Sequence, residues 1–191
     1  MSSASTPPMR ERVVGAAITL TADIGWAQVT MAGIAERVGV SRQTVYNEIG
    51  TKPRLAEAMI LGELDGFLAV VSLAFDAEPD DLTAAIREAS RSVLELAQDN
   101  QLLHAVVSAS HGADTELLPL LTVHAHSLLE AAKAVLVERV AAYGVALPPG
   151  RLDAVVDVVV RVVLSHVMQP SDTPEHTADA IAWIATRVLS G

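Results

Sequence analysis

The clearest hydrophobic pattern of the chain lies in residues 30–55. The apolar positions of its first part are three and four residues apart, which predicts one face of a helix: Met31, Ile34, Ala35 and Val38. Thr30 is a typical N-cap residue, and Gly39 readily adopts the backbone conformation of a sharp turn. Ser41 is the next cap, and it precedes a second short helix in which Val45 and Ile49 lie four residues apart. The pattern therefore predicts two helices joined by a tight turn.

The polar residues of the second short helix fall on the face opposite Val45 and Ile49: Arg42, Gln43, Tyr46 and Asn47. Arginine and glutamine suit bidentate contacts with the edges of guanine and adenine, whereas tyrosine and lysine suit phosphate oxygens. A buried core role is the alternative for Tyr46, but Val45 and Ile49 already fill the inward face. The pattern indicates a helix-turn-helix that reads DNA.

Helix signals continue to the end of the chain, and strand signals are scarce. Residues 8–24 are expected to form the first helix, Thr51 to cap a fourth that reaches about Phe75, and Asp80 to cap a fifth that ends near Asn100. A sixth is expected over 101–110, a seventh from Thr115 (with Pro119 in its first turn) to just before Gly144, and a last helix from Thr173 to about Leu189.

Residues 155–163 are valine-rich, and their periodicity alone does not separate strand from helix. Asp153, Asp157 and Arg161 recur every four residues, which fits both. The segment runs about 18 residues without a turn signal, whereas strands usually have about 5–6 residues. Helix is therefore preferred. The predicted fold is all-α with about nine helices.

Composition and charge favour a helical DNA binder without cysteine chemistry. Of the 191 residues, 51% are hydrophobic and only 3% aromatic, so the core must be mostly aliphatic. No cysteine is present, which excludes disulfides and thiolate sites. Residues 1–55 hold six basic and four acidic residues, a net charge of +2, and the remainder holds seven basic and nineteen acidic ones, a net charge of −12. A weakly basic head on an acidic body would turn the head toward a polyanion.

On these residues the chain resembles the TetR family of bacterial transcriptional regulators. The matching positions cover roughly the first third of the chain: Ala17, Leu20, Gly25, Trp26, Val29, Thr30, Met31, Ile34, Ala35, Val38, Gly39, Val40, Ser41, Thr44, Val45, Tyr46, Ile49, Thr51, Lys52 and Leu55. The resemblance implies an all-helical homodimer with a helix-turn-helix DNA-binding domain, taken here as residues 1–52. It also implies an effector-binding and dimerisation domain, taken as residues 53–191, and repression relieved by a small ligand.

The expected partner is double-stranded DNA with a pseudo-palindromic operator, read by one recognition helix per protomer. Bases would be read by Arg42, Gln43, Thr44 and Asn47, with Ser41 beside them, and phosphates would be bound by Thr30, Tyr46 and Lys52. Two positions depart from the family pattern. Ile49 replaces the usual Phe, and Glu48 stands where His or Tyr is common. If Glu48 faces the duplex, its carboxylate repels phosphate and the operator geometry differs from the commonest one.

The effector is expected to be small, elongated and apolar, either fatty-acyl or alkane-like. The candidate pocket residues are Leu103, His104, Val107, His111, Leu121, His124, Leu128, Val159 and Val163, with Val106 and Leu117 as further apolar walls. The histidines would mark a polar end. Few aromatics and only two lysines, Lys52 and Lys133, argue against a multivalent anion. The alternative is that these residues are ordinary close-packed core.

Dimerisation is expected through the last two helices. The candidate interface residues are Val155, Val162, Trp183, Ile184 and Val188, and the family pairs these elements into a four-helix bundle. For the valine-rich helix, an intramolecular core is a serious rival interpretation.

No metal, cofactor or catalytic activity is expected. His124 and His126 diverge by about 200° on a helix, and no His-Glu-x-x-His, Walker or nucleophile-elbow motif occurs. Residues 155–168 are too short and too charged to span a bilayer, and the N-terminus resembles no signal peptide, so a cytoplasmic protein is expected. A helical adaptor and a tethered enzyme remain the alternatives to a DNA-reading regulator.

Overall fold

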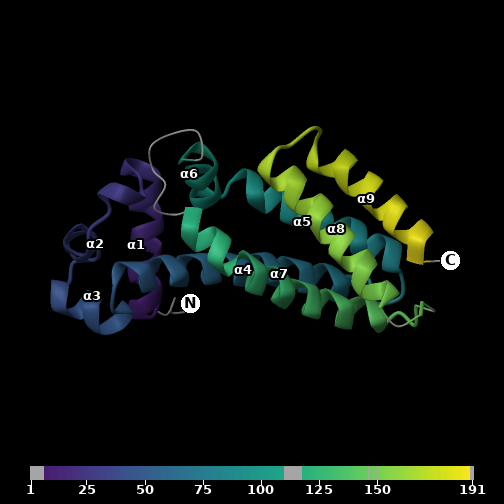
Figure 1. Cartoon of the computed structure of the whole chain (residues 1–191), viewed down its shortest axis with the longest axis horizontal. Coiled ribbons are helices and arrows are strands. Elements are labelled where there is room, and N and C mark those ends of the chain that lie inside the picture. Colours follow the sequence, from purple (N-terminus) through teal and green to yellow (C-terminus); the bar gives the residue numbers. More distant parts are fainter. Residues whose placement is uncertain (1–6, 110–117, 146, 149, 190–191) are drawn as a thin grey trace, which may run out of the picture. The chain divides into compact units, whose positions relative to one another are not determined.

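The computed structural model of the chain describes residues 7–109, 118–145, 147–148 and 150–189, with the side chains of 106–109 and 118–128 left out (Figure 1). Over this part of the chain every regular element is helical, which confirms the predicted all-α fold. The elements are α1 (Met9–Ile24), the single 3-10 turn η1 (Trp26–Gln28), α2 (Met31–Val38), α3 (Arg42–Ile49), α4 (Lys52–Ala77), α5 (Leu82–Gln98), α6 (Gln101–Ala109), α7 (Leu118–Ala141), α8 (Arg151–Met168) and α9 (Pro174–Leu189).

The chain divides into two compact units. One comprises Met1–Glu63 with Gln101–Ala125, and the other comprises Leu64–Asn100 with His126–Gly191. The long helix α4 contributes residues to both. The functional division into residues 1–52 and 53–191 stays a prediction.

The first unit is built around a core to which α1, η1, α2, α3 and the start of α4 all contribute. Its fully buried side chains include Val13, Val29, Ile34, Val45 and Leu55. Trp26 and Val29 lie in this core together with the apolar face of α2. Leu102 of α6 completes this core, and α1 contacts both short helices, so the orientation of α2 and α3 depends on α1 as well as on each other.

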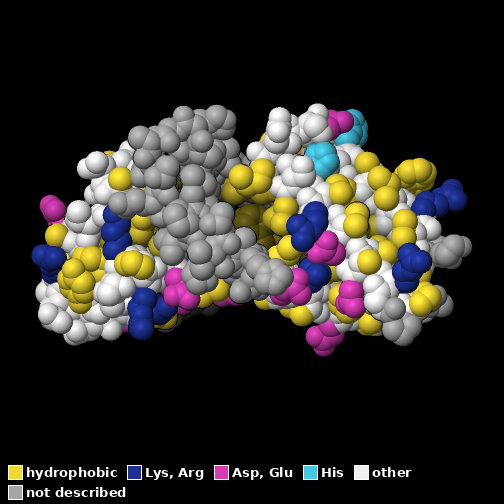
Figure 2. All heavy atoms as spheres, in the orientation of Figure 1, with side chains coloured by type: hydrophobic (Ala, Val, Ile, Leu, Met, Phe, Trp, Pro, Cys, Tyr) yellow, Lys and Arg dark blue, Asp and Glu magenta, His cyan; other side chains and the backbone are white. Residues whose placement is uncertain are grey.

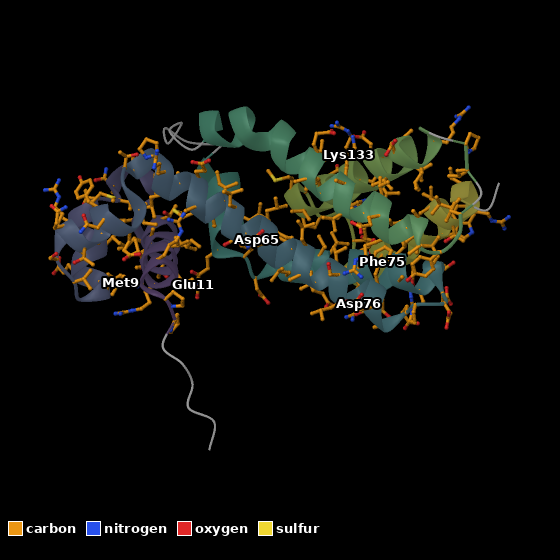
Figure 3. The ribbon with its side chains drawn as sticks, turned by 90° about the horizontal axis from the view of Figure 1, so that it is seen from below. Met9, Glu11, Asp65, Phe75, Asp76 and Lys133 are labelled. Carbon is orange, nitrogen blue, oxygen red and sulfur yellow. The ribbon has the colours of Figure 1, made fainter. Side chains whose placement is uncertain are left out.

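In the second unit the end of α4 shares a core with α5, α8 and α9, and small buried residues let α5 and α9 approach closely: Ala85, Ala89, Ala182 and Ala185. Phe75 and Tyr143 meet edge to face at 6.0 Å between ring centroids. The Tyr143 hydroxyl donates to the Glu78 carbonyl at 2.6 Å, and burial raises the pKa of Tyr143. Beside Phe75, the carboxylate of Asp76 forms an ion pair with Arg139 (Figure 3).

Most predicted helix boundaries are confirmed, and one cap is wrong. The α5 cap is Asp81, whose Oδ1 accepts from the Ala84 N–H at 2.9 Å, and not Asp80. Placing Asp81 at the cap lets Asp80 remain in the preceding turn. The predicted start of the seventh helix at Thr115 lies outside the described residues. Gly144 follows α7 with φ 67°, as expected of a helix end.

The valine-rich segment is helical. It forms α8, which confirms the preference drawn from its length. Thr173 lies just before α9 and its Oγ1 accepts from the His176 N–H at 3.3 Å, which confirms the predicted start.

Among the described residues one helix, α4, is long and apolar enough to cross a membrane, with 26 residues and a mean hydropathy of 1.8 in its most apolar window. Its Leu55 and Met59 lie in the first core, and its Val71 and Phe75 lie in the second. Only 28% of that apolar window is buried within the protein, and Leu61 and Leu73 of α4 are exposed.

Candidate DNA interface

The rotation of α3 about its axis is fixed by two buried side chains. Val45 is fully buried and Ile49 nearly so, both in the first core. The four side chains expected on the opposite face are all exposed, which confirms the predicted orientation: Arg42, Gln43, Tyr46 and Asn47. Thr44 is half-buried, and Glu48 is exposed.

The exposed side chains of α3 form two pairs, each spanning one helical turn. Arg42 lies over the Tyr46 ring, 5.4 Å from its centroid, and its Nη2 donates to the Tyr46 hydroxyl at 3.2 Å. Gln43 Nε2 donates to Asn47 Oδ1 at 2.9 Å. Side chains four residues apart on a helix are neighbours, so both pairs follow from the sequence spacing. The two pairs link the polar side chains to one another along the exposed face of α3.

Hydroxyl caps fix the starts of α2 and α3. Thr30 Oγ1 accepts from the Gly33 N–H at 3.0 Å, and Ser41 Oγ accepts from the Thr44 N–H at 3.1 Å. Ser41 and Thr44 also share a hydrogen bond between their hydroxyls at 2.9 Å. Exposed helix N-termini carry unpaired backbone N–H groups and a partial positive charge, which together suit a phosphate.

The turn between the two short helices depends on Gly39. Its φ of 76° and ψ of 39° lie in the left-handed region. The N–H of Val40 donates to the Ala35 carbonyl at 2.9 Å, and the N–H of Gly39 donates to the Glu36 carbonyl at 3.2 Å. These hydrogen bonds cap the C-terminal end of α2, and the left-handed Gly39 turns the backbone toward α3.

Lys52 lies at the start of α4, where it engages the protein itself. Its Nζ is 4.8 Å from the centroid of the Trp26 ring and donates to the Ala27 carbonyl at 3.4 Å. Ammonium groups are attracted to the face of an indole ring. The Trp26 ring therefore holds the lysine that the sequence analysis assigned to phosphate.

Sequence reasoning gave no role to two arginines of α1. Arg12 Nη2 donates to the Val38 carbonyl at 2.9 Å, and Arg10 Nη1 donates to the Glu48 carbonyl at 3.1 Å. These acceptor carbonyls lie at the C-terminal ends of α2 and α3. A capping arginine that lies 26 or 38 residues from its acceptor leaves no local pattern to read.

Comparison with known proteins gives two family matches. The family of bacterial regulatory proteins, tetR family, matches residues 13–59, and the family described as the C-terminal domain of the bacterial tetracyclin repressor matches residues 81–187. This chain belongs to the TetR family. TetR-family regulators are DNA-binding repressors that respond to small-molecule ligands, and the protein is accordingly a DNA-binding transcriptional regulator.

Individual relatives of this TetR-family chain cover nearly its whole length. The HTH-type transcriptional regulator AlkX of Mycobacterium tuberculosis is 26% identical over 185 residues, 97% of this chain and 87% of that protein. The crystal structure of the TetR family repressor AlkX from Dietzia sp. strain DQ12-45-1b, implicated in biodegradation of n-alkanes, matches with a TM-score of 0.73 and 24% identity over 93% of this chain and 96% of that one. The fatty acid degradation regulator FadR of Bacillus halodurans matches with a TM-score of 0.66 and 17% identity over 95% and 98%. The structural matches establish the fold.

The candidate effector residues of this TetR-family regulator are only partly described. Leu103 is half-buried and His104 exposed on α6, and Val159 and Val163 of α8 pack against the second core. The other candidate side chains lie outside the described ones: Val107, His111, Leu121, His124 and Leu128. No group of metal-ligating side chains occurs among the residues that the structure describes.

The candidate dimer residues lie on α8 and α9. Four of them are exposed apolar side chains: Val162, Trp183, Ile184 and Val188. Val158 of α8 is exposed as well, while Val155 packs against the second core. Figure 2 shows hydrophobic side chains gathered over these two helices.

Proposed function

We propose that this TetR-family regulator is a cytoplasmic homodimer that represses transcription from a pseudo-palindromic operator and is released by a small apolar effector. The exposed face of α3 carries the DNA-binding part of the proposal. Arg42 and the Gln43–Asn47 pair would read base edges, with Ser41 and Thr44 beside them. Arginine pairs bidentately with guanine, and an amide side chain pairs with adenine.

Phosphates would be bound at the starts of α2 and α4 and on the exposed face of α3. Thr30 and Lys52 lie at the N-terminal ends of α2 and α4, and Tyr46 presents its hydroxyl on the exposed face of α3. Such contacts fix the register of a protein on the duplex and make binding depend on salt. Lys52 would reach phosphate while its stem stays beside Trp26.

The dimer would form through α8 and α9. Their exposed apolar side chains form a surface of the kind that water-soluble proteins usually cover: Val158, Val162, Trp183, Ile184 and Val188. A two-fold axis would pair this surface with itself. The two heads would then enter successive major grooves on one side of the DNA.

The effector class is proposed as alkane-like or fatty-acyl. Two observations support it. Residues 53–191 are rich in aliphatic residues and poor in both aromatic residues and lysine. Two of the similar proteins are connected with aliphatic compounds: AlkX of Dietzia is implicated in biodegradation of n-alkanes, and FadR is a fatty acid degradation regulator. An effector bound in the body would act on the heads through α4, which has buried residues in both cores.

Binding of the purified dimer to DNA from upstream of its own coding region tests the first part. We expect a specific, salt-sensitive complex that Arg42→Ala weakens by about 1–3 kcal/mol. A folded dimer that forms no such complex on any upstream fragment would refute the proposal.

Release of that complex tests the second part. Medium-chain alkanes, free fatty acids and acyl thioesters are added separately, with a short-chain alcohol as the control for solvent effects. We expect at least one of the three classes to weaken operator binding by about 5–150-fold, the usual range of allosteric coupling. If none does, and none raises the unfolding temperature, the effector assignment is wrong while the DNA-binding assignment stands.

A further inference from the structure

Two arginines in the first turn of α1 each donate to the end of a different short helix. Arg12 reaches the Val38 carbonyl at 2.9 Å in a partly buried position, at the C-terminal end of α2. Arg10 reaches the Glu48 carbonyl at 3.1 Å in an exposed position, at the C-terminal end of α3.

Both carbonyls lack a hydrogen-bond donor within their own helix. The last four carbonyls of a helix have no partner within it. At the end of α2, the Gly39 N–H donates to the carbonyls of Ala35 and Glu36, and the Val40 N–H donates to the Ala35 carbonyl. The Val38 carbonyl accepts from Arg12 instead.

The end of α3 repeats this arrangement. The Gly50 N–H donates to the Tyr46 carbonyl at 2.8 Å, and the Glu48 carbonyl accepts from the Arg10 guanidinium. A guanidinium is also attracted to the negative end of a helix dipole, which strengthens both contacts.

The helix that carries these arginines is itself firmly placed. Val13 and Ala17 of α1 are fully buried in the first core. Residues two apart on a helix point about 200° away from each other, so Arg10 and Arg12 leave α1 in different directions and reach different helices. Through them α1 is connected to both halves of the helix-turn-helix.

We propose that Arg10 and Arg12 are positioning residues that set the direction of the DNA-reading face of α3 relative to α2, without contacting the duplex. The proposal rests on the proposed function, in which α3 reads the operator. It predicts that removing either arginine lowers the affinity for the operator and leaves the affinity for unrelated DNA unchanged, because only base readout needs the exact direction of α3.

The test compares Arg12→Met, Arg12→Lys and Arg10→Met in the full-length protein. Methionine keeps the length of the stem and removes the donors, whereas lysine retains one charged donor. Arg37→Met is the matched control. Arg37 is an exposed arginine of α2 that pairs with Asp23 at 3.2 Å, so the variant loses the same charge but no helix-end contact.

Three quantities are measured for each variant: the operator dissociation constant over a range of salt, the dissociation constant for unrelated DNA, and the unfolding midpoint. We expect Arg12→Met to weaken operator binding about tenfold, as the loss of one hydrogen bond from a charged donor implies. Arg12→Lys should recover most of the loss, and the slope of affinity against salt should not change. Arg10→Met should show a smaller loss because its contact is exposed.

Two results would overturn the proposal. Equal losses on operator and unrelated DNA, with the salt slope reduced by about one, would make the arginines phosphate contacts. A lower unfolding midpoint with native operator affinity at temperatures where the variant is folded would make them merely structural. If Arg12→Met does not fold, Arg10→Met alone decides. If Arg42→Ala also has no effect on operator binding, the proposed role of α3 is what fails.

Discussion

Replacing Trp183 by alanine is expected to dissociate the proposed dimer. The indole of Trp183 is 62% exposed on α9, next to the exposed Ile184 and on the same helix as Val188. A large aromatic side chain left in water at this level is unusual unless another surface covers it. The change removes most of the exposed apolar surface of the residue and leaves the buried face of α9, with Ile181 and Ala185, untouched.

The size of the effect follows from the exposed fraction. A tryptophan side chain has roughly 150–250 Å² of surface to bury, so 62% exposure leaves about 120 Å² for a partner. Truncation to alanine removes about 100 Å² of this, or about 2.5 kcal/mol at about 25 cal/mol per Å². A two-fold interface contains each residue twice, which gives about 5 kcal/mol per dimer. The dissociation constant of the dimer should therefore rise by between about three and four orders of magnitude.

Sedimentation velocity over a dilution series measures this dissociation constant directly. Ile24→Ala serves as the control, because Ile24 is also an exposed large apolar residue, at 52%, but lies at the end of α1. We expect Ile24→Ala to match the native dimer and Trp183→Ala to sediment as a monomer at the same concentration. A native chain that is monomeric at micromolar concentration, or a Trp183→Ala dimer of unchanged affinity, would refute the assignment of this surface.

Further predictions concern stability. Asp81→Ala should lower the unfolding midpoint by an amount equivalent to about 1 kcal/mol through loss of the α5 cap, while Asp80→Ala, which removes the neighbouring carboxylate, should not; equal effects of the two changes would contradict the cap assignment. Gly39→Ala should cost about 1–2 kcal/mol in chemical denaturation, because its φ of 76° disfavours a side chain although the space there is open; an unchanged midpoint would show that the turn tolerates alanine. Hydrogen bonding from Arg91 lowers the pKa of Glu88 in the folded state, so its stabilising contribution is present at neutral pH and is lost as the pH falls from the ordinary pKa of a glutamate through the lowered pKa of Glu88. Acid titration of Glu88→Gln should accordingly show a shallower loss of stability than the native protein, and since both side chains are more than a third exposed the difference should be small.

The orientation of α3 could be predicted from the sequence because two apolar residues in eight leave little choice. Val45 and Ile49 must face the core, and the polar side chains then face outward. In α8 the opposite holds. Twelve of its eighteen positions are apolar, so the pattern identifies a helix by length but does not say which valines are inside. Val155 was expected at the dimer surface but is partly buried against the second core, whereas Val158, which was not among the candidates, is 59% exposed.

The sequence could not predict which of two adjacent aspartates caps a helix, or which residues distant in the chain meet in the fold. Asp80 and Asp81 are chemically equivalent caps, and only the path of the preceding turn places the carboxylate of Asp81 at the first N–H groups of α5. The helix-end contacts of Arg10 and Arg12 depend on how α1 packs across two other helices. Lys52 could be recognised by its place in a family pattern, but its position over an indole ring depends on the packing of η1 against α4.

Five basic residues in the first unit make contacts within the protein itself. Arg10 and Arg12 donate to helix carbonyls, and Arg37 pairs with an aspartate. Arg42 lies over a tyrosine ring and Lys52 over a tryptophan ring. With a net charge of only +2 over residues 1–55, one head has little general attraction for a polyanion. Joining two heads raises the overall affinity by about 10²–10⁴ when both engage. A variant that cannot dimerise should lose this factor on the operator while each head keeps its fold and its exposed α3 face. Dimerisation, more than charge, is therefore expected to set the operator affinity of this regulator.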